Sequence, residues 1–340
     1  MRAVAYQNSL AIDQQQSLID INLPEPVAHG HDLLVEVKAI SVNPVDTKIR
    51  KRVQPEAGQY KVLGWDAAGI VKAVGDAVSQ FKVGDKVFYA GDLSRPGTNS
   101  EFHLVDERIV GLKPKTLSFE QAAALPLTSI TAWEALFDRL KIRTSDSTET
   151  GTILIIGGAG GVGSIAIQLL RALTGLTIIA TASRPESKAW CQKLGAHLVL
   201  DHSQSLTEQF QAQQLQAPQY VFSTTHTDQH LQAISEIIAP QGALVLIDDP
   251  EQLDIGLLKR KSVAIHWEFM FTRSLFQTSD MQAQGSLLNE VAQLVDAGKI
   301  HSTQNQTLGI INAPNLKKAH ALLESNQSIG KIVLSGFEPS

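Results

Sequence analysis

The chain has little cysteine, no long basic run and no long apolar stretch. Its only cysteine, Cys191, excludes an internal disulfide framework and a metal site built from several cysteines. The net charge of −5 argues against nucleic acid or an anionic membrane surface as a partner. No stretch approaches the ~18 apolar residues of a membrane span, and the first residues lack the apolar core of a signal peptide. These absences predict a soluble protein of the reducing cytoplasm.

The sequence pattern changes near residue 127, which indicates two domains in the 340 residues. Before that point the pattern is β-rich, and residues 32–42 alternate apolar and polar side chains. After it, helical stretches such as Gly161–Leu173 and Gln229–Ile238 alternate with apolar runs at 152–156, 177–182, 197–200, 219–223, 243–247 and 262–267. This alternation predicts an α/β fold in which helices cover both faces of a doubly wound parallel sheet. The tail predicts two amphipathic helices and a strand, at 281–297, 315–325 and 331–334.

Five glycines fall within residues 157–163, between an apolar run and a helical stretch. Gly158, Gly160 and Gly163 match G-x-G-x-x-G, in which glycine lets the backbone approach a pyrophosphate at a helix N-terminus. The pattern can be only a tight turn, but the strand before it and the helix after it favour a dinucleotide site. We therefore expect these residues to contact the cofactor: Gly158, Gly160, Gly161, Val162 and Gly163.

The next strand ends where the adenosine ribose is expected, and it lacks the acid that an NAD site usually carries there. Ser183, Arg184 and Lys188 occupy this region instead. A hydroxyl, a guanidinium and an ammonium suit a 2′-phosphate, so we predict NADPH as the cofactor, with His202 as a further phosphate contact. The same residues can form a solvated helix start, with Ser183 as the cap and Glu186 completing a capping box. Both interpretations can hold together.

The residues before the glycine cluster carry a family resemblance. They are the segments 35–46 (VEVKAISVNPVD), 64–69 (GWDAAG), 83–87 (VGDKV) and 122–126 (AAALP). With the glycine cluster they resemble the medium-chain dehydrogenase/reductase superfamily from end to end of the chain. Within it, the chain is most similar to the quinone-reductase-like branch, in the group labelled zinc-type alcohol dehydrogenase-like proteins.

This resemblance implies a GroES-like catalytic domain over residues 1–126, completed by residues 271–340. It implies a Rossmann dinucleotide-binding domain over residues 127–270, with the active site in the cleft between the domains. It also implies a homodimer formed through the edges of the Rossmann sheets.

The resemblance to zinc enzymes does not extend to the metal ligands. Catalytic zinc in alcohol dehydrogenases is bound by two cysteines and a histidine. At the first cysteine position this chain has Asn43, at the histidine position it has Trp65, and residues 125–128 contain no sulfur where the other cysteine falls. We therefore predict no zinc site.

Two other stretches have less specific patterns. His226, Asp228 and His230 could be drawn as a metal site, but they follow a strand and begin a helix that Thr227 or Asp228 would cap. Residues 267–271 (WEFMF) follow a strand near the expected nicotinamide. They can be ordinary packing or a wall that faces cofactor or substrate.

Without zinc, the favoured reaction is reduction of an acceptor that takes hydride directly, such as a quinone or an α,β-unsaturated carbonyl. Asn43, Thr128 and Tyr89 are the candidate hydrogen-bond donors to the developing oxyanion, with water supplying the final proton. The residues assigned to the substrate cleft are Asp46, Trp65, Asp66, Phe269 and Phe271. The sequence thus predicts an NADPH-dependent quinone or enone reductase. The alternatives are a zinc alcohol dehydrogenase with unusual ligands and a non-catalytic NADPH-binding sensor.

Overall fold

The computed structural model describes residues 1–144 and 150–338. The chain folds into two compact units, Met1–Ile130 with Phe271–Ser340, and Thr131–Met270. Residues 145–149 and 339–340, which belong to the predicted domains, lie outside the described residues. No helix among the described residues is long and apolar enough to cross a membrane.

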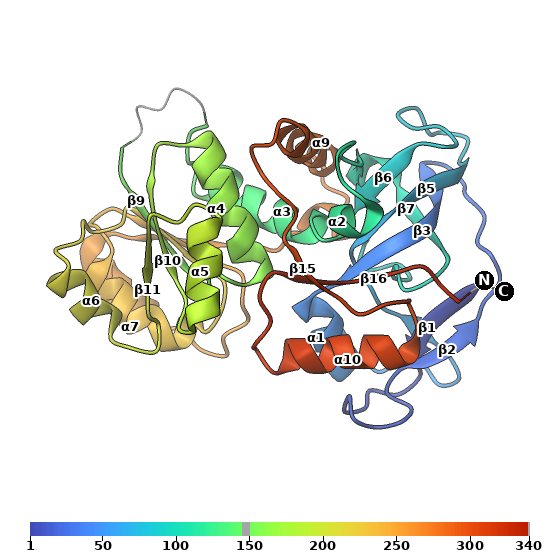
Figure 1. Cartoon of the computed structure of the whole chain (residues 1–340), viewed down its shortest axis with the longest axis horizontal. Helices are drawn as coiled ribbons and strands as arrows, with labels where there is room; N and C mark the ends of the chain where they lie inside the picture. Colours follow the sequence, from blue (N-terminus) through green and yellow to red (C-terminus); the bar gives the residue numbers. More distant parts are fainter. Residues whose placement is uncertain (145–149, 339–340) are drawn as a thin grey trace. The chain divides into compact units, whose positions relative to one another are not determined.

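The first unit is built around the long strand β3 (Asp32–Val42), which Figure 1 shows running through its centre. Strand β3 pairs with β16, β5 and β7, and the larger sheet follows the order β15-β16-β3-β5-β6-β8. A smaller sheet has the order β2-β1-β4. The other strands of this unit are β1 (Arg2–Tyr6), β2 (Ile19–Asn22), β4 (Lys61–Val62), β5 (Ala67–Val74), β6 (Lys86–Tyr89), β7 (Phe102–Asp106), β8 (Val110–Leu112), β15 (Gln304–Thr307) and β16 (Lys331–Ser335).

The first unit also contains several helices. They are α1 (Pro44–Arg52), η1 (Glu107–Ile109), α2 (Phe119–Ala123), α8 (Thr272–Leu275), α9 (Ala283–Asp296) and α10 (Ala313–Glu324). Helix α3 (Pro126–Trp133) begins in the first unit and continues into the second. Because β16 comes from the end of the chain and pairs antiparallel with β3, the last residues complete the first sheet.

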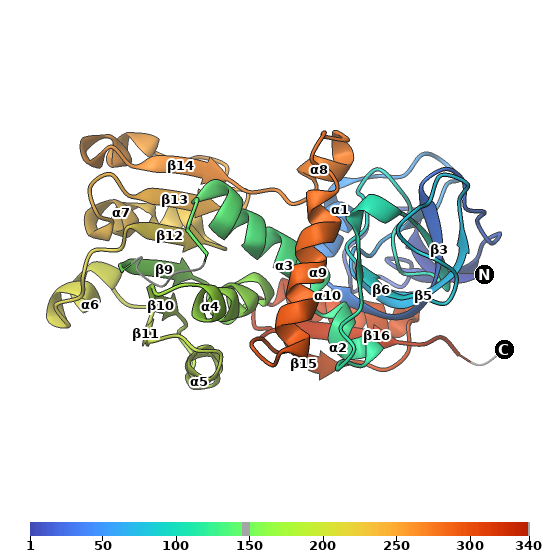
Figure 2. The ribbon, with the colours of Figure 1, turned by 90° about the horizontal axis from the view of Figure 1, so that it is seen from above.

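The second unit is a parallel sheet of six strands in the order β11-β10-β9-β12-β13-β14. Figures 1 and 2 show α4 and α5 on one face of this sheet and α6 and α7 on the other. The order reverses at β9, so the carboxyl ends of β9 and β12 flank the position where such sheets bind ligands. The elements are η2 (Glu134–Arg139), β9 (Thr152–Ile156), α4 (Gly161–Leu173), β10 (Thr177–Thr181), α5 (Pro185–Lys193), β11 (Leu198–Leu200), α6 (Leu206–Ala212), β12 (Tyr220–Ser223), α7 (Thr227–Ile237), β13 (Ala243–Leu246), η3 (Ile255–Lys261) and β14 (Ala264–Trp267).

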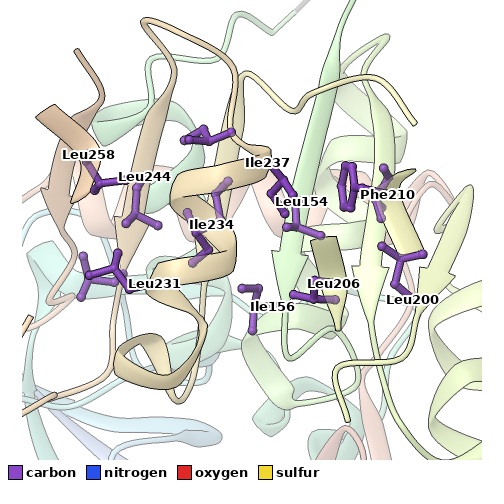
Figure 3. Close-up of a cluster of buried hydrophobic side chains, with 14 residues drawn as sticks. Leu154, Ile156, Leu200, Leu206, Phe210, Leu231, Ile234, Ile237, Leu244 and Leu258 are labelled. Carbon is purple, nitrogen blue, oxygen red and sulfur yellow. The ribbon is translucent and has the colours of Figure 1, made fainter. Parts of the chain in front are cut away.

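A cluster of buried aliphatic side chains fixes α6 and α7 against this sheet (Figure 3). Leu231, Ile234 and Ile237 recur at helical spacing along α7, so they share the face that is turned to the sheet. They pack against Leu154 of β9 and Leu244 of β13. Burying each such side chain contributes on the order of 1.5–3 kcal/mol, which holds the strand ends, and therefore the loops that follow them, in place.

The predicted fold class is confirmed, but two predicted helix starts are wrong. Helix α5 is capped by Arg184 without a side-chain bond, because Pro185 takes the first helical position, so Ser183 is not the cap. Helix α7 is preceded by His226 in a left-handed conformation, at φ 50°. Its Thr227 hydroxyl donates instead to Asp248, at 2.5 Å. Neither Thr227 nor Asp228 is therefore the cap.

Candidate active site

A fully buried polar cluster lies at the centre of the first unit. Asn43 follows β3, Asp66 precedes β5 and Lys331 opens β16, and at most 3% of each is exposed. The Asp66 Oδ2 atom accepts hydrogen bonds from Asn43 Nδ2, at 2.8 Å, and from Lys331 Nζ, at 3.0 Å. Its Oδ1 atom accepts the Leu127 N–H, at 2.8 Å. The carboxylate is thus held by donors from three separate segments.

Lys331 is the residue of this cluster that the sequence analysis missed. Its ammonium also donates to the Val42 carbonyl, at 2.9 Å, and to Asn43 Oδ1. Burial lowers the pKa of Lys331 and raises that of Asp66, and their mutual attraction and hydrogen bonds act against both shifts. Three acceptors around the ammonium and several donors around the carboxylate favour the ion pair. The only signal in the sequence is a lysine at the start of an otherwise apolar strand.

Asp46 adds a second carboxyl group to the cluster. It lies in the first turn of α1, and its Oδ2 accepts the Asn43 N–H at 2.7 Å. Burial raises the pKa of Asp46 to about 7, although the Asn43 N–H and the Lys331 charge act against this. Asp46 therefore carries a proton over most of the range below pH 7. The predicted cleft residues Asp46 and Asp66 are brought together, one neutral and one paired.

The three predicted donors have different hydrogen-bond partners. The Asn43 amide belongs to the cluster, and the Thr128 hydroxyl donates to the Leu125 carbonyl at 3.1 Å. The Tyr89 hydroxyl lies 3.1 Å from His103 Nδ1, and burial raises its pKa. In the β5–β6 pairing Tyr89 lies opposite Ala67, the residue after Asp66. All three side chains are thus buried, and their roles stay predictions.

The aromatic residues that the sequence analysis assigns to the cleft belong to different units. Trp65 is fully buried, its ring meets Phe271 edge-to-face at 6.3 Å, and its Nε1 donates to the Asp92 carbonyl at 3.3 Å. Phe269 belongs to the second unit and is 49% exposed. The structure therefore brings Trp65 and Phe271 together within the first unit.

The glycines of the turn in the second unit differ in backbone conformation and in the space that a Cβ would find. Gly157 has a positive φ of 82°. A Cβ on Gly158 would lie 2.8 Å from the Ala180 Cβ, and one on Gly163 only 2.4 Å from the Gly157 carbonyl oxygen. A Cβ on Gly160, by contrast, would meet nothing closer than 3.5 Å. The fold itself thus requires glycine at 158 and 163, whereas at Gly160 the space above the backbone is open to a ligand.

The ribose region holds more charge than the sequence analysis recognised. Arg184 is 38% exposed and lies 3.5 Å from the Glu186 carboxylate. Lys188 donates to Asp201, at 2.8 Å, and this hydrogen bond is the main cause that lowers the pKa of Asp201 to about 2. The sequence analysis missed Asp201, because it follows β11 rather than β10. Lys188 and Arg184 are thus each paired with a carboxylate, and their side chains are 35% and 38% exposed.

His202 connects this region to the glycine turn. Its Nδ1 lies 3.0 Å from the Thr181 Oγ1, which also accepts the Gly157 N–H at 3.1 Å. Its ring centroid is 6.2 Å from that of His230 on α7. His202, a predicted phosphate contact, is thus joined to the glycine turn through Thr181.

The family descriptions "Alcohol dehydrogenase GroES-like domain" and "Zinc-binding dehydrogenase" match residues 29–124 and 194–334. A zinc-type alcohol dehydrogenase-like protein of Staphylococcus epidermidis is 39% identical over 98% of this chain and 99% of its own length. The chain belongs to the medium-chain dehydrogenase/reductase superfamily, in its quinone-reductase-like branch. It is accordingly an oxidoreductase of the medium-chain type.

Two solved structures of this superfamily are similar over nearly their whole length. A candidate zinc-dependent alcohol dehydrogenase from Rhizobium etli has a TM-score of 0.96 and 58% identity, and covers 100% of this chain and 99% of its own. A quinone oxidoreductase from Pseudomonas syringae has a TM-score of 0.82 and 26% identity, and covers 98% and 99%. The names of these medium-chain relatives thus point both to zinc enzymes and to quinone reductases.

The donor set of this medium-chain protein does not fit a catalytic zinc ion. Asn43 offers an amide that already bonds Asp66 and Lys331, and Trp65 offers an indole whose nitrogen donates rather than accepts. Over residues 1–144 and 150–338, no group of three or more His, Cys, Asp or Glu side chains is arranged to hold a metal ion. Cys191 is buried, and burial raises the pKa of its thiol to about 12, which makes it unreactive.

Proposed function

We propose that this protein is an NADPH-dependent, zinc-independent oxidoreductase that transfers hydride to a quinone or an α,β-unsaturated carbonyl compound. The observation that carries the proposal is the chemistry of the residues at the zinc-ligand positions. Asn43 stands at the first cysteine position and its amide hydrogen-bonds to Asp66 and Lys331, while Trp65 stands at the histidine position and its indole donates to the Asp92 carbonyl. NADPH, when bound, supplies the hydride.

The absence of zinc ligands restricts the reaction. Oxidation of an alcohol requires removal of a proton from a very weak acid, which zinc makes possible by lowering the pKa of the bound oxygen. A quinone or an enone accepts hydride directly and places negative charge on an oxygen atom. Fixed hydrogen-bond donors then suffice to stabilise that charge.

We assign the donor role to Asn43, Thr128 and Tyr89, as the sequence predicts. Each of them already has a protein partner, so a substrate oxygen must replace one existing acceptor. Asn43 is the strongest candidate, because its amide is polarised by the Lys331 ammonium on Oδ1. The assignment of Trp65, Phe269 and Phe271 to the substrate cleft stays a prediction, and we propose that the proton comes from water.

Preference for NADPH rests on the groups after β10. Arg184 is accessible and can pair a phosphate through its two-pronged guanidinium. Ser183 offers a hydroxyl, and His202 lies on the neighbouring loop. Asp201 could accept from a ribose hydroxyl, but it already accepts hydrogen bonds from Lys188 and from Ser203.

We further propose that the protein is a cytoplasmic homodimer. The parallel sheet ends at β14, whose outer edge has no strand partner among the described residues. Trp267 on this strand is 57% exposed. A large exposed aromatic side chain on an unpaired edge favours association with a second copy.

A turnover screen tests the proposal. Purified protein is supplied with NADPH or NADH together with a quinone, an enone or an aldehyde. In a separate assay it is supplied with a primary alcohol and the oxidised cofactor. We expect oxidation of NADPH with the quinone or the enone, and much slower oxidation of NADH. Turnover of the alcohol alone would contradict the proposal, and cofactor binding without any turnover would favour a sensor.

A further inference from the structure

Three histidines converge beside the proposed phosphate site, at the carboxyl ends of neighbouring strands. His202 follows β11, and His226 and His230 lie at the start of α7, just after β12. The rings of His202 and His230 are 6.2 Å apart, and His226 is exposed and close enough to influence both electrostatically. This histidine trio is not arranged to hold a metal ion, since no such group exists among residues 1–144 and 150–338.

The surroundings of the trio lower the pKa of two of its imidazoles, those of His202 and His230. Burial is the main cause that lowers the pKa of both His202 and His230, and the other imidazoles lower each of them further. Lys188 also lowers the pKa of His202, whereas Asp201 raises it. Asp228 and Asp248 raise that of His230, but Asp248 already accepts two hydrogen bonds from Thr227. Burial and the neighbouring imidazoles thus outweigh these carboxylates at His202 and His230.

We propose that the histidine trio is a proton-linked subsite for the 2′-phosphate of the cofactor. The inference rests on the proposed use of NADPH. His202 is the anchor, because its hydrogen bond with Thr181 joins it to the Gly157 end of the glycine turn. Arg184 and Lys188 supply permanent charge at the same edge, and the trio supplies charge that appears only when the dianion arrives.

The direction of the pH dependence follows from linkage. A dianion beside the trio raises the pKa of the imidazoles, so the complex holds more protons than the free protein. Binding of the 2′-phosphate therefore takes up protons and strengthens as the pH falls toward 6.5. The ratio of the affinities of two ligands that differ only in this phosphate isolates the effect.

Calorimetric titration with 2′,5′-ADP and 5′-AMP tests the inference, because the two ligands differ only in the 2′-phosphate. We expect the affinity ratio of 2′,5′-ADP to 5′-AMP to rise roughly fivefold to tenfold from about pH 8 to pH 6.5 if close to one proton is taken up. Titration in two buffers of different ionisation enthalpy measures that uptake directly. A wild-type ratio that stays constant, with no proton uptake, overturns the inference.

Variants test whether the histidine trio takes up the protons that accompany ligand binding. In His202→Gln/His230→Gln the pH dependence of the ratio should flatten, while His266→Gln, on β14 at the other end of the sheet, should keep it. Binding of 5′-AMP reports whether each variant is folded. A double variant that keeps the full pH dependence overturns the inference even if NADPH is preferred, whereas a wild-type ratio near one at every pH contradicts the proposed use of NADPH itself.

Discussion

The charged groups of the two candidate sites lie in different environments, buried in the first unit and partly exposed in the second. In the first unit, Asn43, Asp66 and Lys331 are almost completely buried and satisfy one another. In the second, the Arg184 side chain is 38% exposed, and His202 and His230 are only partly buried. The closed cluster is part of the protein core, whereas groups of the second site reach solvent. We propose that charge in this protein serves rigidity in the first unit and recognition of a ligand in the second.

Removing the cation of the closed cluster should have the largest effect. In Lys331→Met the Asp66 carboxylate is left buried without its partner, which should lower the free energy of unfolding by roughly 3–5 kcal/mol. Chemical denaturation measures the loss. The double variant Lys331→Met/Asp66→Asn is the control and should recover part of it. A loss below about 1 kcal/mol in the single variant would show that the cluster is not a tight ion pair.

The second-largest effect is expected when a side chain fills the open space above the glycine turn. Gly160→Val should weaken cofactor binding roughly 100-fold or more without lowering the melting temperature, because its Cβ meets only ligand space. The matched control is Gly163→Ala, whose Cβ would clash with the Gly157 carbonyl and should lower the melting temperature instead. Unchanged cofactor affinity in Gly160→Val would mean that the glycines serve only a turn.

Arg184→Ala tests recognition by permanent charge. Loss of the charge-assisted hydrogen bonds should weaken NADPH binding by ~1.5–3 kcal/mol and leave NADH binding nearly unchanged. Lys193→Ala, at the other end of α5, is the control and should affect neither. Equal affinity of the unmodified protein for the two cofactors would remove the basis of this prediction.

Asp46→Asn should have the smallest effect on the free energy of unfolding, and this effect depends on pH. Because burial raises the pKa of Asp46 to about 7, ionisation costs stability as the pH rises from about 4 to 7. Asparagine keeps the acceptor for the Asn43 N–H and never ionises. The variant should therefore be more stable than the wild type by roughly 1–3 kcal/mol at pH 8 and not at pH 4. Lower stability at pH 8 would mean that Asp46 is needed as an anion, against Lys331.

Local patterns predicted the fold well because they depend on neighbouring residues. The alternation over 32–42 and the helical spacing over 161–173 correspond to β3 and α4 residue for residue. Lys331 and Asp201 were missed because their partners are brought near only by strand pairing, and Lys331 lies 265 residues from Asp66. The predicted caps were wrong where backbone geometry decided, at Pro185 and His226. The roles of Asn43, Thr128 and Tyr89 depend on a bound substrate and stay predictions.

The zinc content of active enzyme tests the central claim most directly. Purified protein is analysed for metals and then assayed for NADPH-dependent reduction of a quinone or an enone, before and after dialysis against a strong chelator. We expect no stoichiometric zinc and unchanged activity after chelation, since the amide of Asn43 and the indole of Trp65 cannot replace thiolate and imidazole. About one tightly bound zinc ion per chain, lost together with activity on chelation, would contradict the account and restore the alcohol dehydrogenase mechanism.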